Sequence, residues 1–87
     1  MNKKWKVITR EPLRVERALN ERSAIIEQAP GTLLYLIYVS GPEGKYETTR
    51  NAYGCAINAA DVFLNTGYAL GWLPPGGISN IVESLYL

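Results

Sequence analysis

The apolar run from Leu33 to Val39 limits the possible folds more than any other feature of the sequence. Residues 32 to 40 are rich in β-branched and aromatic side chains and lie between Gly31 and Gly41, which predicts a β-strand. Side chains alternate between the two faces of a strand, and here both faces are apolar. One face would carry Leu34, Leu36 and Tyr38, and the other Leu33, Tyr35, Ile37 and Val39. The sheet that contains this strand must therefore be covered on both sides.

Helices can cover one face of such a sheet, and the second face needs another cover because a bare apolar face of this kind marks an interaction site. A second copy of the chain is the simplest cover, and it would make the protein a homodimer. The alternative is cover from within the chain, either by the terminal segment or by the loop at residues 68 to 77. The sequence leaves both possibilities open.

The chain has 87 residues, enough for one domain (residues 1–87) that buries about 60% of its unfolded surface. Its longest strongly apolar run, residues 33 to 39, is far below the roughly 20 residues of a membrane-spanning helix. The basic start at residues 1 to 6 is not followed by the apolar stretch of a signal peptide. The one cysteine cannot form an internal disulfide, which agrees with a reducing compartment. We therefore expect a cytoplasmic protein without a membrane partner.

Periodicity and turn residues predict the order of the first elements. Alternation at residues 3 to 9 predicts a strand. A helix is predicted over residues 13 to 28, because Val15, Leu19 and Ile26 form one stripe at about 100° per residue. A competing interpretation ends this helix near Asn20 and makes residues 23 to 28 a strand. After the strand at residues 32 to 40, the residues Gly41-Pro42-Glu43-Gly44 predict a turn into a further strand at residues 45 to 49.

A second helix is predicted to follow, capped by Thr49 or Asn51 and ending near Gly67. Residues 78 to 87 fit a short helix and a closing strand equally well. With a closing strand the fold is a ferredoxin-like βαββαβ arrangement, and with a helix it is a three-stranded sheet packed with two to three helices. Both are two-layer α+β sandwiches, and neither implies a particular function.

The composition argues against catalysis. The chain has no histidine, and so it lacks the commonest general base and the commonest metal ligand. One cysteine and scattered carboxylates do not make a structural zinc site, and no phosphate-binding glycine loop is present. We expect Cys55 to be an inert core residue, because cysteine is often buried and no base lies near it in the sequence. The protein is therefore expected not to be an enzyme and to hold neither a cofactor nor a metal.

Aromatic usage points to protein binding. The chain has six tyrosines and two tryptophans against one phenylalanine, and these two residue types are enriched in binding hot spots. Leu70, Trp72 and Leu73 lie in one loop, which either docks on the core or contacts a partner. The candidate protein-binding residues are Tyr35, Tyr38, Tyr68, Trp72 and Tyr86.

The N-terminal quarter is locally basic and offers an alternative. Residues 1 to 22 hold seven of the nine Lys and Arg against three Glu. On the predicted strand and helix these cations could follow a phosphate backbone, although interleaved glutamates favour a solvated face with ion pairs. The candidate nucleic-acid-binding residues are Lys4, Lys6, Arg10, Arg14 and Arg17.

The sequence thus favours a small non-catalytic protein-binding module that acts by surface occlusion, as a homodimer or on a larger partner. Small motif-free chains of this type include inhibitors of a host nuclease or defence complex that phages and mobile elements encode. The alternative is a nucleic-acid-binding regulatory domain that uses the basic N-terminal face. A small-molecule pocket is a third possibility on which the sequence is silent.

Overall fold

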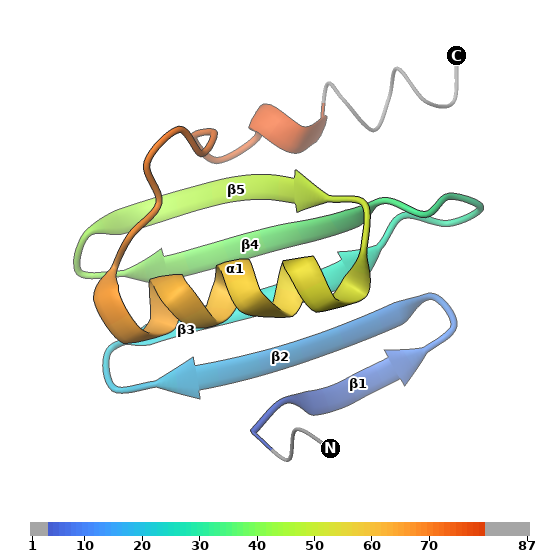
Figure 1. Ribbon diagram of the computed structural model, residues 1–87, viewed down its shortest axis with the longest axis horizontal. Coiled ribbons are helices and arrows are strands. Elements are labelled where there is room, and N and C mark those ends of the chain that lie inside the picture. The colour runs from blue at the N-terminus through green and yellow to red at the C-terminus, as the bar shows by residue number, and fades with distance from the viewer. Residues whose placement is uncertain (1–3, 80–87) are drawn as a thin grey trace.

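The computed structural model describes residues 4 to 79 of the chain. In that range a five-stranded antiparallel sheet has its strands side by side in sequence order. One helix lies across one face of this sheet (Figure 1). The strands are β1 (Lys6–Arg10), β2 (Leu13–Leu19), β3 (Arg22–Gln28), β4 (Tyr35–Gly41) and β5 (Gly44–Arg50), and the helix is α1 (Tyr53–Thr66).

The predicted helix over residues 13 to 28 is wrong, because these residues form the hairpin β2–β3. Asn20 lies in its turn with a φ of 57°, a left-handed conformation that asparagine tolerates better than most residues. The apolar stripe nevertheless grouped the correct side chains, since Val15 and Ile26 are cross-strand neighbours in the core. The competing interpretation of residues 23 to 28 as a strand is confirmed by β3.

The predicted fold class is wrong as a consequence. Neither the ferredoxin-like βαββαβ arrangement nor the three-stranded sheet with two to three helices matches five strands and one helix. Each strand follows its neighbour through a short hairpin connection, so no helix crosses between strands. The error lies mainly in residues 13 to 28, where two strands replace one predicted helix.

The second half of the chain is close to the prediction. β4 and β5 pair through the register Gly41↔Gly44, which confirms the predicted turn. Helix α1 ends at Gly67, whose φ of 80° is left-handed and whose N–H donates to the carbonyl oxygen of Phe63 at 2.7 Å. The predicted cap is wrong, because the residue before the helix is Ala52 and no side chain caps this end.

The main core lies between α1 and the sheet. Trp5, which precedes β1, is buried there and donates from Nε1 to Oδ1 of Asp61 on α1 at 3.1 Å. The same carboxylate accepts a hydrogen bond from Arg17 of β2 at 2.6 Å, and only 8% of the Arg17 side chain is exposed. This network ties the helix to the β1–β2 side of the sheet. The fully buried large side chains of the core are Val15, Ile26, Ile37, Phe63 and Leu64.

The second apolar face of β4 is covered, in part, by the chain itself. The predicted alternation is confirmed within β4: Ile37 and Val39 belong to the core under α1, while Leu36 belongs to a separate cluster. It is wrong for Leu33, which precedes the strand and is 76% exposed. Leu36 is 7% exposed and packs with Ile78, so the C-terminal segment supplies cover at this point. The other members of this cluster are Ala29, Leu34, Tyr38 and Leu73.

The C-terminal segment reaches this cluster by passing the outer edge of β5 (Figure 1). Leu73 pairs with Glu47 at that edge through two backbone hydrogen bonds of 2.8 and 2.7 Å. Residues 77 to 79 begin a helical turn, and the rest of the terminal segment, for which helix and strand were both predicted, lies outside the described residues. Among residues 4 to 79, no helix is long and apolar enough to cross a bilayer.

Candidate protein-binding surface

The loop at residues 67 to 72 is held at both ends. Its start is the left-handed Gly67 that terminates α1. At its end the ring of Trp72 stacks on Phe63 with centroids 6.1 Å apart, and the guanidinium of Arg50 lies 6.0 Å from the Trp72 ring. A turn within the loop is closed by the Trp72 N–H, which donates to the carbonyl oxygen of Ala69 at 3.1 Å. The loop is therefore fixed before any partner binds.

Two apolar side chains of this loop face solvent. Leu70 is 80% exposed and Tyr68 is 55% exposed, although the loop around them is anchored. The sequence left open whether this loop docks or contacts a partner. In the structure Ala69, Trp72 and Leu73 pack on the two clusters, whereas Tyr68 and Leu70 do not. Tyrosine is enriched in binding hot spots, and the exposed leucine beside it adds apolar area on a loop that is already ordered.

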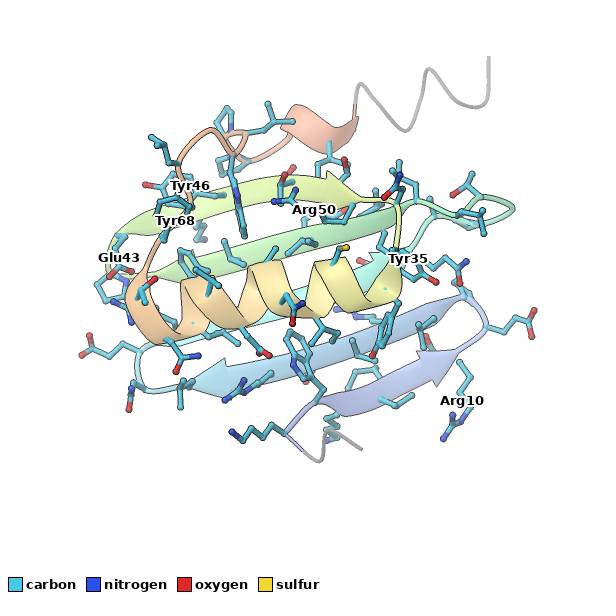
Figure 2. All side chains as sticks on the ribbon, in the orientation of Figure 1. Arg10, Tyr35, Glu43, Tyr46, Arg50 and Tyr68 are labelled. Carbon is cyan, nitrogen blue, oxygen red and sulfur yellow. The ribbon has the colours of Figure 1, made fainter. Side chains whose placement is uncertain are left out.

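A shallow hollow accompanies these exposed side chains. It has a volume of about 550 Å³ and lies between the 67–72 loop and Tyr46 of β5. Tyr46 and Tyr68 lie close together beside the end of α1 (Figure 2). The hydroxyl of Tyr46 donates to the carbonyl oxygen of Glu43 at 2.9 Å, which fixes its ring. The surface formed by Tyr46, Tyr68 and Leu70 is called the loop surface below.

An ion pair supports the loop from below. Arg22, at the start of β3, donates from Nε to Oε1 of Glu43 at 3.0 Å and from NH1 to the carbonyl oxygen of Leu64 at 3.3 Å. The hydrogen bond from Arg22 lowers the pKa of the Glu43 carboxyl below its ordinary value. The Glu43 carboxylate in turn packs against Gly67, where an added Cβ would lie 2.6 Å from its carbon. Contacts from β3, from the β4–β5 turn and from the end of α1 therefore fix the start of the loop.

The other predicted aromatic residues do not join the loop surface. Tyr35 lies on the helix side of the sheet, where its ring is 5.6 Å from Tyr53. Tyr38 lies on the opposite side, half-buried, and burial raises its pKa. Tyr86 lies outside the described residues. The predicted set is therefore spread over both faces, and only Tyr68 and Trp72 belong to the 67–72 loop.

The five basic candidates are not brought together on one face. Because residues 13 to 19 form a strand, Arg14 and Arg17 point to opposite sides of the sheet. Arg17 is committed to the ion pair with Asp61. Lys6 is the cross-strand neighbour of Glu16, and Arg14 is that of Glu27, so acidic residues interleave with these cations. Lys4 precedes β1 and Arg10 is its last residue, so these two exposed cations lie toward opposite ends of that strand. This arrangement gives no continuous track for a phosphate backbone.

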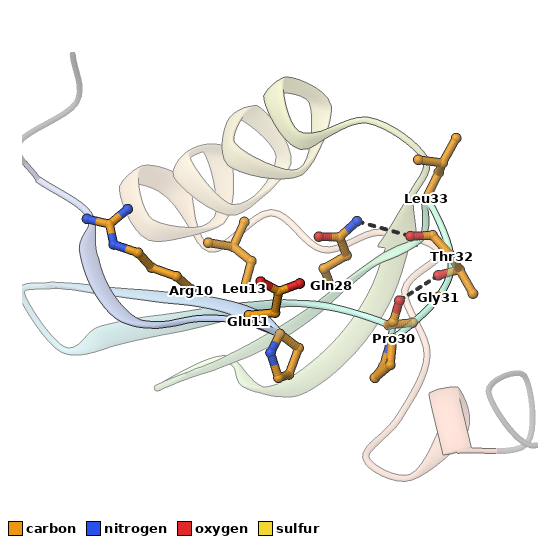
Figure 3. A pocket seen from close by; sticks show the side chains of 10 residues that line it. Arg10, Glu11, Leu13, Gln28, Pro30, Gly31, Thr32 and Leu33 are labelled. Atoms are coloured by element: carbon orange, nitrogen blue, oxygen red, sulfur yellow. Dashed lines mark hydrogen bonds between the residues drawn. The ribbon is translucent and has the colours of Figure 1, made fainter.

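Another hollow lies between the β1–β2 turn and the β3–β4 loop and has a volume of about 590 Å³ (Figure 3). Two of its polar side chains form hydrogen bonds within the chain. Gln28 donates from Nε2 to the carbonyl oxygen of Thr32 at 3.0 Å, and the Thr32 hydroxyl donates to the carbonyl oxygen of Ala29 at 2.8 Å. Because no aromatic side chain among the described residues lines this hollow, it is a weaker candidate for protein binding than the loop surface.

Sequence reasoning missed two features. Leu70 was not among the predicted site residues, although its place between Gly67 and Gly71 indicates a loop tip at which an apolar side chain stands out. Cys55 was expected in the core, but it is exposed in the first turn of α1. Among residues 4 to 79, no group of three or more metal-ligating side chains comes together.

Comparison of the chain with protein-family models, with curated proteins and with solved structures finds no match. A proposal about function must therefore come from the surfaces described above.

Proposed function

We propose that the protein is a non-catalytic binding module that uses the loop surface to occlude a site on a partner protein. The observation that carries this proposal is the 80% exposure of Leu70 on a loop that is fixed at both ends. A side chain on a rigid loop loses little conformational entropy when it binds, so its apolar area contributes more fully to affinity. Tyr46 and Tyr68 supply the aromatic area and the hydroxyl groups that commonly surround such an anchor.

The predicted homodimer stays a prediction, and the structure offers it less apolar area than the sequence indicated. Leu36, on which the expectation depended, is buried against Ile78 of the same chain. Inhibition of a host nuclease or defence complex is likewise a prediction, drawn from the type of chain. Both are compatible with a module whose contact surface is the 67–72 loop.

The test compares two exposed apolar side chains in a capture experiment. Tagged protein is used to capture partners from cells, and the bound proteins are quantified by mass spectrometry. Leu70→Gln should reduce the recovery of the specific partner at least tenfold, because an apolar anchor worth more than 1.4 kcal/mol is lost. Val62→Gln changes a side chain that is 47% exposed on α1, and it should leave recovery unchanged.

Both variants should unfold at the same denaturant concentration as the unmodified protein, since the replaced side chains are exposed. Equal recovery by Leu70→Gln and the unmodified protein would overturn the proposal. So would an equal loss with both variants, because that result would mean non-specific apolar adhesion.

A further inference from the structure

The edge of the sheet at β1 is open along its whole length in the part of the chain that the structure describes. The outer edge of β5 is closed at its middle by the two hydrogen bonds between Glu47 and Leu73. The outer edge of β1 pairs with no strand among residues 4 to 79, and all five residues of β1 are exposed. Unpaired N–H and C=O groups along an edge are a template on which another strand can form.

An apolar groove runs beside this edge. Helix α1 packs over β3 and β4, so it does not cover the helix-facing side of β1. The resulting hollow has a volume of about 460 Å³, and Val7 and Tyr53 are 42% and 38% exposed there. It is called the edge groove, and it is lined by Val7 and Val15 of the sheet, by Trp5 just before β1, and by Tyr53, Gly54, Ile57 and Asn58 of α1.

The side chains of the edge groove are held in place without a bound partner. The hydrogen bond to Asp61 holds the indole of Trp5, and the contact with Tyr35 holds the ring of Tyr53. Gly54 contributes no side chain, and a Cβ added at Gly54 would meet no atom within 4 Å. The space above Gly54 is therefore open to the side chain of a bound segment.

Two features of β1 limit which strands can pair with its edge. Lys6 is the cross-strand neighbour of Glu16 and Arg10 that of Leu13, so the two cations lie on opposite faces of the sheet. The register shift between Val7 and Thr9 leaves Ile8 as an extra residue, and such a bulge further restricts which strands can pair. β1 itself carries two cations and no anion, so it fits a strand with acidic residues at matching positions.

We propose that an extended acidic segment of a partner protein pairs with β1 as a sixth strand. An apolar side chain opposite Val7 enters the edge groove, and acidic residues lie opposite Lys6 on one face of the sheet and opposite Arg10 on the other. Five residues of strand span about 17 Å, so a segment of five to seven residues is sufficient. This site is separate from the loop surface, and it does not depend on the function proposed above.

The experiment uses two synthetic peptides and the full chain. Both peptides are blocked seven-residue strands of alternating valine and threonine, with glutamates near both ends in one and lysines in the other. Binding is followed by chemical-shift changes of backbone amides and of the Trp5 indole N–H in two-dimensional NMR spectra. The acidic peptide should shift residues 6 to 10 and the Trp5 indole, and it should bind about five to ten times more tightly than the basic peptide at low salt.

Variants at Gly54 test the groove. Gly54→Leu should weaken binding of the acidic peptide at least tenfold, because the leucine side chain fills the space that the peptide needs. Gly54→Ala should change the affinity for this peptide by less than twofold. The double variant Lys6→Gln, Arg10→Gln should bind the two peptides with nearly equal affinity. Leu70→Gln should leave peptide binding unchanged, which separates this site from the loop surface.

Three outcomes would overturn the proposal. The first is equal binding of the two peptides to the unmodified protein. The second is a set of shifts that excludes β1, and the third is full affinity in Gly54→Leu. A thermal melt of each variant confirms that loss of binding does not come from loss of folding.

Discussion

At the scale of single residues, two glycines with different surroundings show how the backbone limits substitution. Gly67 has a left-handed φ of 80° and lies against the Glu43 carboxylate, which Arg22 holds in place. Gly54 lies in the first turn of α1, and a Cβ there meets open space. The same change to alanine should therefore have opposite effects at the two positions.

We predict that Gly67→Ala lowers the free energy of unfolding by about 2 kcal/mol, since a left-handed alanine is strained and its Cβ would displace the Glu43 side chain. Gly54→Ala should raise the free energy of unfolding by about 0.5–1 kcal/mol, because alanine favours the helix. Urea unfolding of both variants, followed by circular dichroism, measures the difference. Equal stability of Gly67→Ala and the unmodified protein would show that the helix end tolerates a side chain.

At the scale of elements, the Arg22–Glu43 pair joins the β2–β3 hairpin, the β4–β5 turn and the end of α1. The Arg22 hydrogen bond holds the pKa of Glu43 below the ordinary value of 4.5. A carboxyl with a lowered pKa in the folded state stabilises the fold fully above its ordinary pKa. That stabilisation is lost as the pH falls through the lowered value.

We therefore predict that Glu43→Gln has a smaller loss of stability between pH 7 and pH 2.5 than the unmodified protein. The measurement is the urea midpoint at a series of pH values. Glu11→Gln, which removes an exposed carboxylate in the β1–β2 turn, is the control and should keep the acid sensitivity of the unmodified protein. An acid sensitivity that Glu43→Gln leaves unchanged would contradict the role of the ion pair.

The elements also show which parts of the fold the sequence could predict. The strand predicted over residues 32 to 40 is found at residues 35 to 41, and the turn at Gly41 to Gly44 and the end of α1 at Gly67 are confirmed, because each carries a strong local pattern. The β2–β3 hairpin was missed because Arg17 occupies a core-facing position, where its pairing with Asp61 hides the apolar alternation of a strand. That pairing depends on a residue 44 positions away, so no local pattern reveals it.

The candidate site was predictable to a similar degree. The aromatic content indicated a binding surface, and Tyr68 and Trp72 do lie in one loop. The division of that loop into a docked end and an exposed tip depends on the stacking of Trp72 on Phe63, which is a tertiary contact. The basic candidates do not gather on one face because residues 13 to 19 form a strand and not the predicted helix. A strand places Arg14 and Arg17 on opposite faces of the sheet.

At the scale of the whole molecule, α1 covers one face of the sheet, and Ile78 of the same chain covers part of the other face around Leu36. Ile78 is 1% exposed, and its N–H donates to Oε1 of Glu47 at 3.2 Å. Its removal should uncover Leu36 and Tyr38, and exposed apolar area of this kind promotes association.

We predict that Ile78→Asp costs about 3 kcal/mol of stability and raises the average mass above that of the unmodified protein at equal concentration. Light scattering over a range of concentrations measures the mass. Ser79→Asp places the same charge on the exposed neighbour and should change neither quantity. An unchanged mass for Ile78→Asp would mean that the uncovered face does not associate.

The attachment of Leu73 to the edge of β5 has a mechanical consequence. Among the described residues, tension applied to the C-terminal end reaches Ile78 first, then the two Leu73 hydrogen bonds, and only then the stacked Trp72. These contacts therefore break one after another before any strand is pulled out of the sheet. A single-molecule pulling trace should accordingly show a short, weak extension at low force ahead of the cooperative rupture of the five strands.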